Sequence, residues 1–390
     1  MTARAIYPAR RAVEHAVTVP GVRPVRLFAV SWPLWEVEVT ANVYDEQAYE
    51  VIDRFLARAL KEGDIGTRDG LVAFFGLEPA LVDRCLAFLA VIGHLTVDRH
   101  GEVRLTELGL RSVRAKVRYT PKESRQRVLI ERFTGRPLPG RYHRGSLTVL
   151  PSPNVPQEML EDRTRFLTLF APTVFQQKMV DDLAARPDRA DYNLPAQLKE
   201  IKGIAVRDAY LPTYLIETSD RSLLAYTDAG SGRDDFMEAA CRDVQGIRVR
   251  IDTVDRVKPR ELWTEWLADR KLGPGRLQEL PNAVWRVILA PEAFSGPPKL
   301  PLSRVGSFQL RNHHFLQLWC DDARLRHRAA LERVLGMARL YAVRTRADLT
   351  DRAAVLAVQL EVAVPTFAEL RAHAVGERMY DHLGHLDMLE

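Results

Sequence analysis

The chain has 390 residues, 46% of them hydrophobic, and a formal net charge of +5. This length and composition are typical of a soluble globular protein of roughly two or three domains with a large core. They exclude a membrane-spanning protein, because no apolar run approaches the roughly 20 residues that cross a bilayer.

The N-terminus MTARAIYPARRAVEH contains arginines but no apolar stretch behind them, which argues against a secretory signal. The three cysteines, Cys85, Cys241 and Cys320, are far apart and form no C-x-x-C pair. Their number and spacing argue against a disulfide framework and against a structural zinc site. We therefore expect a cytoplasmic protein that holds no metal and no cofactor.

Residues 35–43 alternate apolar and polar side chains with period two, which predicts a strand within an N-terminal extension, residues 1–44. The next segment, DEQAYEVIDRFLARALKEG, changes to helical spacing. Thr67 can cap a second helix, and Gly76-Leu77 can form the turn before a third helix that runs from Pro79 to Ile92. Together these patterns predict a tri-helical unit.

A hairpin and a further helix follow. In HLTVDRHGEVRLTELG two short alternating strands flank Asp98-Arg-His-Gly101, and Thr106 can cap the next helix. The order of elements and the G-H-L…G-E-V-R-L-T-E-L-G pattern resemble a bacterial winged helix-turn-helix domain over residues 45–117, about a fifth of the chain. The resemblance implies DNA binding, with the third helix in the major groove. We expect the strand of residues 1–44 to pack on this domain.

Residues 118–156 contain many prolines and glycines and predict a basic connector. Residues 157–390 predict a mixed C-terminal domain. Its expected helices are 157–185, one from Asn193, 234–242, 259–271 and those after Asp321; its expected strands are 214–226, 247–254, 283–289 and 307–319. The predicted fold class is α+β, with an N-terminal winged helix-turn-helix domain and a mixed α/β C-terminal domain that has a helical end.

The distribution of charge raises a question about the DNA-binding interpretation. The third helix has one exposed arginine, Arg84, near the acids Glu78 and Asp83, which is poorly suited to reading bases. In contrast, residues 99–144 contain 13 Lys and Arg against four acids, whereas residues 36–83 contain 11 acids against four basic residues. The basic stretch can contact phosphates without using the third helix. It can equally be a solvated surface or a partner of the acidic stretch.

We therefore predict that DNA, if bound, meets the hairpin and the residues after it. At helical spacing Arg111, Arg114 and Arg118 fall on one face, as a row that follows phosphates would. The complete set of candidate nucleic-acid-binding residues is Arg84, Arg99, His100, Arg104, Arg111, Arg114, Lys116, Arg118, Lys122, Arg125 and Arg127.

Two patterns that carry chemistry are weaker. Pro187-Asp188 followed by Glu200-Ile-Lys202 matches the P-D…E-x-K pattern of metal-dependent nucleases, but helical spacing after Asn193 would make Glu200 and Lys202 diverge. In the histidine-rich tail, His373, Glu377 and Asp381 at i, i+4 and i+8 could hold a divalent metal, although a solvated helix face explains them better. Motifs for nucleotide hydrolysis are absent from the sequence, and we predict no catalytic residues.

The sequence thus favours a non-enzymatic protein that binds double-stranded DNA mainly through phosphates. Such a protein would be a regulator or the nucleic-acid-engaging subunit of a multi-protein bacterial system. One alternative is a protein-interaction scaffold that uses the winged helix as a docking surface, with protein partners or a second copy of itself. The other is a metal nuclease built on Asp188, Glu200 and Lys202.

Overall fold

The computed structural model describes residues 6–144, 147–160, 164–254, 256–340 and 343–389. The prediction that the N-terminus is not a secretory signal depends partly on residues 1–5, which lie outside these ranges. The chain divides into two units. Unit 1 comprises residues 1–33, 146–172 and 209–390, and unit 2 comprises residues 34–145 and 173–208. Among the helices in the described ranges, none has both the length and the apolar character needed to cross a bilayer.

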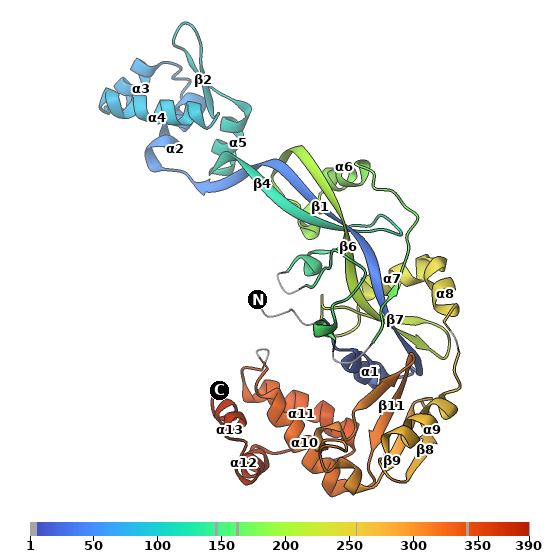
Figure 1. Cartoon of the computed structure of the whole chain (residues 1–390). Helices are drawn as coiled ribbons and strands as arrows, with labels where there is room; N and C mark the ends of the chain where they lie inside the picture. Colours follow the sequence, from blue (N-terminus) through green and yellow to red (C-terminus); the bar gives the residue numbers. More distant parts are fainter. Residues whose placement is uncertain (1–5, 145–146, 161–163, 255, 341–342, 390) are drawn as a thin grey trace. The chain divides into compact units, whose positions relative to one another are not determined.

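Unit 2 contains a sheet built on residues 34–48 of β1 (Pro24–Ala48). These residues pair antiparallel with β4 (Val117–Glu131), and β6 (Leu198–Thr218) is the next strand (Figure 1). The alternation predicted for residues 35–43 is confirmed, because every second side chain is buried. These side chains form a core with Val128 and Ile130 of β4 and with helix α6 (Lys178–Ala185).

The rest of unit 2 is mainly a compact helical module, residues 49–116, which we call the α2–α5 module. Its elements are α2 (Val51–Glu62), α3 (Arg68–Phe75), α4 (Pro79–Val91), β2 (Leu95–Val97), β3 (Val103–Leu105) and α5 (Glu107–Ala115). Leu56, Leu71 and Leu89 are fully buried at its centre. Thr67 and Thr106 cap α3 and α5 by accepting hydrogen bonds from backbone amides three residues later. The elements predicted for this stretch are therefore present in the predicted order.

Unit 1 combines two sheets with helices. Its elements are α1 (Ala9–Thr18), β5 (Leu167–Thr168), β7 (Leu223–Tyr226), α7 (Asp235–Asp243), α8 (Gln245–Asp252), α9 (Pro259–Arg270), β8 (Gly275–Glu279), β9 (Trp285–Leu289), β10 (Phe308–Arg311), β11 (His314–Trp319), α10 (Ala323–Met337), α11 (Arg346–Leu360), α12 (Phe367–Gly376) and α13 (Tyr380–Asp387). Helix α1 packs on Tyr214 of β6 and Tyr226 of β7. The second sheet, ordered β10-β11-β9-β8, shares a core with α9–α13. The chain is thus a mixed α and β protein that ends in helices.

Several predicted elements are wrong. Residues 118–131 are not an irregular connector but strand β4, and Pro121 is tolerated because β4 lies at the edge of its sheet. The helix expected from Asn193 is strand β6, whose Leu198, Ile201 and Ile204 all face one core at a spacing of three. Such a spacing imitates a helix, and only the pairing of β6 beside β1 shows that the segment is a strand.

The strand expected at 247–254 is wrong for a related reason. It is helix α8, which buries Ile247 and Ile251 four residues apart. The apolar residues of Ile-Arg-Val-Arg-Ile fit period two and helical spacing equally well. The single helix expected over 157–185 is also wrong, because this range holds a short 3-10 turn (Gln157–Met159), β5 and α6.

The two units do not follow the predicted boundaries at 44, 117 and 156. Residues 1–33 belong to unit 1 with α1, and residues 118–145 belong to unit 2 through β4. Pairing between strands far apart in sequence, such as β1 with β4, decides this division. Spacing along the chain does not contain that information.

Candidate functional site

By the winged-helix resemblance, DNA bases would be read on the surface formed by α3, α4 and the β2–β3 hairpin. It holds four arginines and five carboxylates: Arg68, Arg84, Arg99 and Arg104 against Asp69, Glu78, Asp83, Asp98 and Glu102. Arg68 donates to Asp83 at 2.8 Å, and Arg104 donates to Glu102 at 2.8 Å. The surface therefore lacks the surplus of positive charge that phosphate binding requires.

The prediction that Arg111, Arg114 and Arg118 share one helical face is wrong. Helix α5 ends at Ala115, and Lys116 turns the chain into β4 with a left-handed backbone, φ 58°. The guanidinium of Arg118 lies 5.1 Å from the ring centroid of Phe88 and donates to the Gln47 Oε1 at 2.6 Å. It also lies 3.9 Å from the Asp53 carboxylate.

The Arg111 guanidinium, in contrast, lies 4.6 Å from the ring centroid of Tyr119, the strand neighbour of Arg118. Arg111 also donates to the Gln197 side chain. Because neighbouring residues of a strand point to opposite faces, Arg111 and Arg118 lie on opposite sides of β4.

The remaining predicted residues are also spread out. Arg99 and His100 are exposed at the hairpin tip. Arg127 approaches Glu36 at 3.4 Å, and Lys122 lies on the face of β4 opposite to Arg125. The single cationic surface expected from the hairpin through Arg127 is therefore not formed. The left-handed residue at the end of α5 is the physical reason, since it separates the helix from the strand.

An apolar face lies instead on α2 and α4. Four of its large apolar side chains are exposed to solvent: Val51 is 67%, Phe55 49%, Phe88 37% and Val91 85% exposed. Beside them is a hollow of about 540 Å³. Its lining residues are Glu50, Val51, Ile52, Asp53, Arg84, Cys85, Phe88 and Arg118. Contiguous exposed apolar surface with a polar rim is typical of interaction sites.

The polar groups around this hollow differ in charge and in whether they are already paired. Burial raises the pKa of the Cys85 thiol to about 11, so Cys85 contributes a small neutral surface. Arg118 is held by Gln47 and Asp53. Arg84 is exposed and makes no ion pair with any residue in the described ranges. Arg84 is thus available to a carboxylate of a partner.

A second face of the module, on α2 and α5, is basic. Arg54, Arg58 and Lys61 of α2 are all exposed. A hollow of about 200 Å³ lies between the two helices, lined by Tyr49, Arg54, Arg58, Glu62, Val113 and Lys116. The sequence does not indicate the α2 residues, because the three cations are outnumbered by the acids of residues 36–83.

The nuclease pattern does not assemble a metal site. Both carboxylate oxygens of Asp188 accept hydrogen bonds from Arg186, at 2.8 and 2.6 Å. Glu200 and Lys202 do not diverge on a helix as expected, because both lie on strand β6, and Lys202 Nζ is 3.8 Å from Glu123. Within the described ranges, no group of three or more His, Cys, Asp and Glu side chains could hold a metal ion.

The C-terminal metal pattern is also contradicted. Helix α12 ends at Gly376, so His373, Glu377 and Asp381 are not on one continuous helix. Glu377 instead accepts a hydrogen bond from Arg328 at 3.3 Å. The first of the helices expected after Asp321 is α10, and Asp322 caps it by accepting a hydrogen bond from the Arg324 backbone amide at 2.8 Å.

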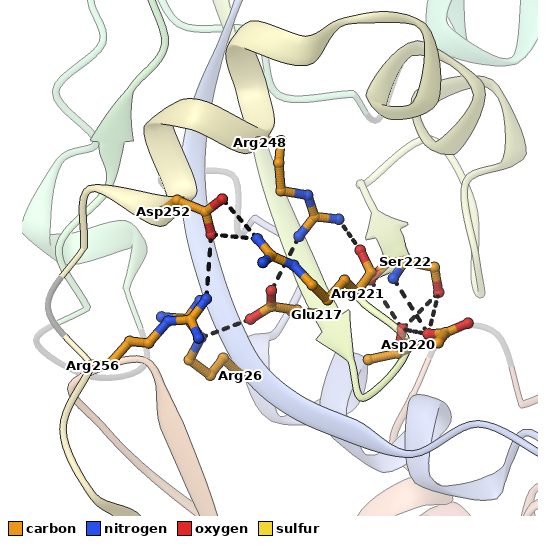
Figure 2. A network of polar contacts seen from close by, with 9 residues as sticks. Arg26, Glu217, Asp220, Arg221, Ser222, Arg248, Asp252 and Arg256 are labelled. Carbon is orange, nitrogen blue, oxygen red and sulfur yellow. Dashed lines mark hydrogen bonds and ion pairs between the residues drawn. The ribbon is translucent and has the colours of Figure 1, made fainter.

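Unit 1 contains a dense polar cluster that the sequence did not indicate. Figure 2 shows Arg26 of β1, Glu217 of β6 and Arg248 of α8 converging. Glu217 accepts from Arg26 Nε at 2.7 Å and from Arg248 at 3.1 Å. Asp252 accepts from Arg221 at 2.7 Å. The acidic groups are engaged by arginines of the same unit, so this cluster stabilises the fold rather than presenting an active site.

Comparison with known proteins gives no relative. No family model, curated protein or solved structure matches this chain.

Proposed function

We propose that this protein is a non-enzymatic subunit of a multi-protein system and docks another protein on the apolar face of α2 and α4. The observation that carries this proposal is the exposure of Val51, Phe55, Phe88 and Val91 on one module. The module resembles a winged helix in its order of elements, and α4 corresponds to the helix that normally reads bases. Here α4 offers apolar side chains where base reading needs hydrogen-bond donors and acceptors.

The hydrophobic contribution of this face is modest. Fully covering the four exposed side chains contributes about 5 kcal/mol, taking ~2 kcal/mol for each complete burial and scaling by exposure. Association costs roughly 4–15 kcal/mol in lost freedom. The partner must therefore add polar contacts at the rim to reach a stable complex.

The partner that fits is an amphipathic helix that carries carboxylates beside its apolar side chains. A helix places apolar residues three and four apart along a line, which suits a hollow flanked by two helices. The exposed Arg84 beside Phe88 makes no ion pair within the part of the chain that the structure describes. A carboxylate of the partner would form an ion pair with Arg84 and would fix the orientation of the partner helix.

A site-specific photo-crosslinker tests the proposal. Phe88 is replaced by a photoreactive phenylalanine analogue in the native host, and Phe74 is replaced in a matched strain. Phe74 is a suitable control because it is 66% exposed on α3 and is not part of the α2–α4 hollow. We expect one protein to crosslink at position 88 and not at position 74. The purified partner should then bind the chain, and Phe88→Asp should weaken binding at least tenfold while Phe74→Asp leaves it unchanged.

Other outcomes would overturn the proposal. Crosslinks to a second copy of the chain, with a dimer in sedimentation, would assign the face to self-association. Crosslinks to nucleic acid at position 88 would restore the base-reading interpretation. Equal crosslinking at both positions would show that the α2–α4 face has no special role.

A further inference from the structure

The basic face of α2 and α5 uses different residues from the apolar face of α2 and α4. We propose that this basic face binds the phosphate backbone of double-stranded DNA without reading its sequence. It differs from the predicted surface, which used the hairpin, Arg118 and the rest of β4. The proposal does not depend on protein docking, because the two faces use different residues.

The two faces adjoin on helix α2. Leu56 and Ala57 point into the core, and Val51 lines the α2–α4 hollow. Arg54, Arg58 and Lys61 follow one another at i, i+4 and i+7, which places them on one stripe. This stripe borders α5, because Arg54 and Arg58 line the same hollow as Val113 and Lys116.

Counting both helices and the residue that follows α5 gives a clear excess of positive charge. On the side that borders the hollow the exposed cations are Arg54, Arg58, Lys61, Arg114 and Lys116, and the exposed carboxylate is Glu62. Arg111 is not counted, because it stacks on Tyr119 and donates to Gln197. The surplus is therefore four positive charges. Arg58 is paired with Glu62 at 2.7 Å, whereas Arg54 and Lys116 form no ion pair with a residue in the described ranges.

The hollow itself suits a phosphate group. Its volume is about 200 Å³, and its lining includes Arg54, Arg58 and Lys116 together with Glu62, whose carboxylate pairs with Arg58. Lys116 adopts a left-handed backbone, a conformation that glycine takes with less strain. The fold thus places a lysine ammonium beside two guanidinium groups at a position where glycine would be easier to accommodate.

The shape and composition of the face favour a duplex over other polyanions. Seven residues of helix extend about 10 Å, and a duplex carries about six phosphate charges along that length. A membrane-binding surface needs apolar side chains that insert among lipids. Helix α5 carries none of the exposed large apolar side chains of the described residues, whereas α2 carries Val51 and Phe55 beside the stripe.

Fluorescence anisotropy tests the proposal with the full chain and a labelled 20-base-pair duplex of arbitrary sequence, at salt concentrations from 50 to 200 mM. With four phosphate contacts the affinity should fall roughly 150-fold over this range. The Arg54→Ala/Lys116→Ala variant should retain two contacts and lose only about 12-fold, and its logarithmic salt slope should be less steep by about 1.8. The matched control is Arg84→Ala/Arg99→Ala, which removes two exposed cations that do not line the α2–α5 hollow.

An unchanged slope in the Arg54→Ala/Lys116→Ala variant would overturn the proposal, as would equal effects of the two double variants. Circular dichroism verifies that both remain folded. Binding to phosphatidylserine vesicles that is lost in the same variant, without DNA binding, would assign the face to a membrane instead. Phe88→Asp should leave DNA binding unchanged, so failure of protein docking and failure of DNA binding can be distinguished.

Discussion

The Glu217→Gln substitution tests the polar cluster of unit 1 most directly. Arg26 and Glu217 are only 4% and 5% exposed, and Arg26 Nε donates to Glu217 Oε2 at 2.7 Å. Arg248 donates to the other carboxylate oxygen at 3.1 Å (Figure 2). Glutamine preserves the size of the side chain and removes its charge. The change therefore isolates the electrostatic part of the interaction.

The expected cost follows from the position of Arg26. Its Nη1 and Nη2 atoms are buried without a hydrogen-bond partner, so Glu217 is the carboxylate that compensates this guanidinium within the described residues. Removing one partner of a buried ion pair costs about 3–5 kcal/mol of unfolding free energy. Arg26→Met should cost less than Glu217→Gln, because Glu217 retains Arg248. Replacing both residues, as in Arg26→Met/Glu217→Leu, should recover most of the loss.

Urea unfolding followed by tryptophan fluorescence measures these effects mainly in unit 1. Five of the six tryptophans belong to it: Trp32, Trp263, Trp266, Trp285 and Trp319. Taking a slope of ~2–3 kcal/mol per molar urea, Glu217→Gln should lower the midpoint by about 1–2 M. A loss below about 1 kcal/mol, or a larger loss for Arg26→Met, would refute the reasoning, since the buried charge would then be compensated by some other group.

Three further predictions concern single residues. Gly109→Ala should destabilise the α2–α5 module by about 2 kcal/mol, seen as a lower Tm, because the added Cβ would overlap the carbonyl oxygen of His94. Lys116→Gly should raise stability by about 0.5–1 kcal/mol by relieving its left-handed backbone, and should weaken DNA binding in the anisotropy assay. Burial lowers the pKa of His314 to about 4. Between about pH 6.5 and pH 4, His314 is protonated in the unfolded chain and neutral in the folded chain. The free energy of unfolding therefore falls by up to ~3 kcal/mol as the pH falls through this window. Between pH 7 and pH 4 the natural chain should lose about 3 kcal/mol more unfolding free energy in urea than His314→Gln, in which the other buried histidines still titrate.

The fold was predictable where one local rule governed it. Residues 35–43 alternate because one face of β1 is buried, and Thr67 and Thr106 cap helices because their side chains satisfy free amides. Prediction failed where the spacing was ambiguous. The spacing of three in β6 and the Ile-Arg-Val-Arg-Ile of α8 each fit the wrong element. Only contact with a core selects between such alternatives.

The candidate surfaces were predictable to a smaller extent. The sequence indicated that the α4 face is poorly suited to DNA, because its charges are visible residue by residue. It did not indicate that Arg111 and Arg118 lie on opposite sides of β4, because that depends on the left-handed Lys116. Nor did it indicate that Arg54, Arg58 and Lys116 share one hollow.

The amino-acid sequence by itself determined the mixed α and β fold class, the order of elements in the α2–α5 module and the excess of arginine after residue 98. These properties depend on composition and on neighbours within about one helical turn. The tertiary structure alone decided the division into two units, the meeting of Arg26 with Glu217 and the separation of an apolar face from a basic one. Each of these depends on contacts between residues distant in the chain, and no periodicity along the chain specifies which distant residues will meet.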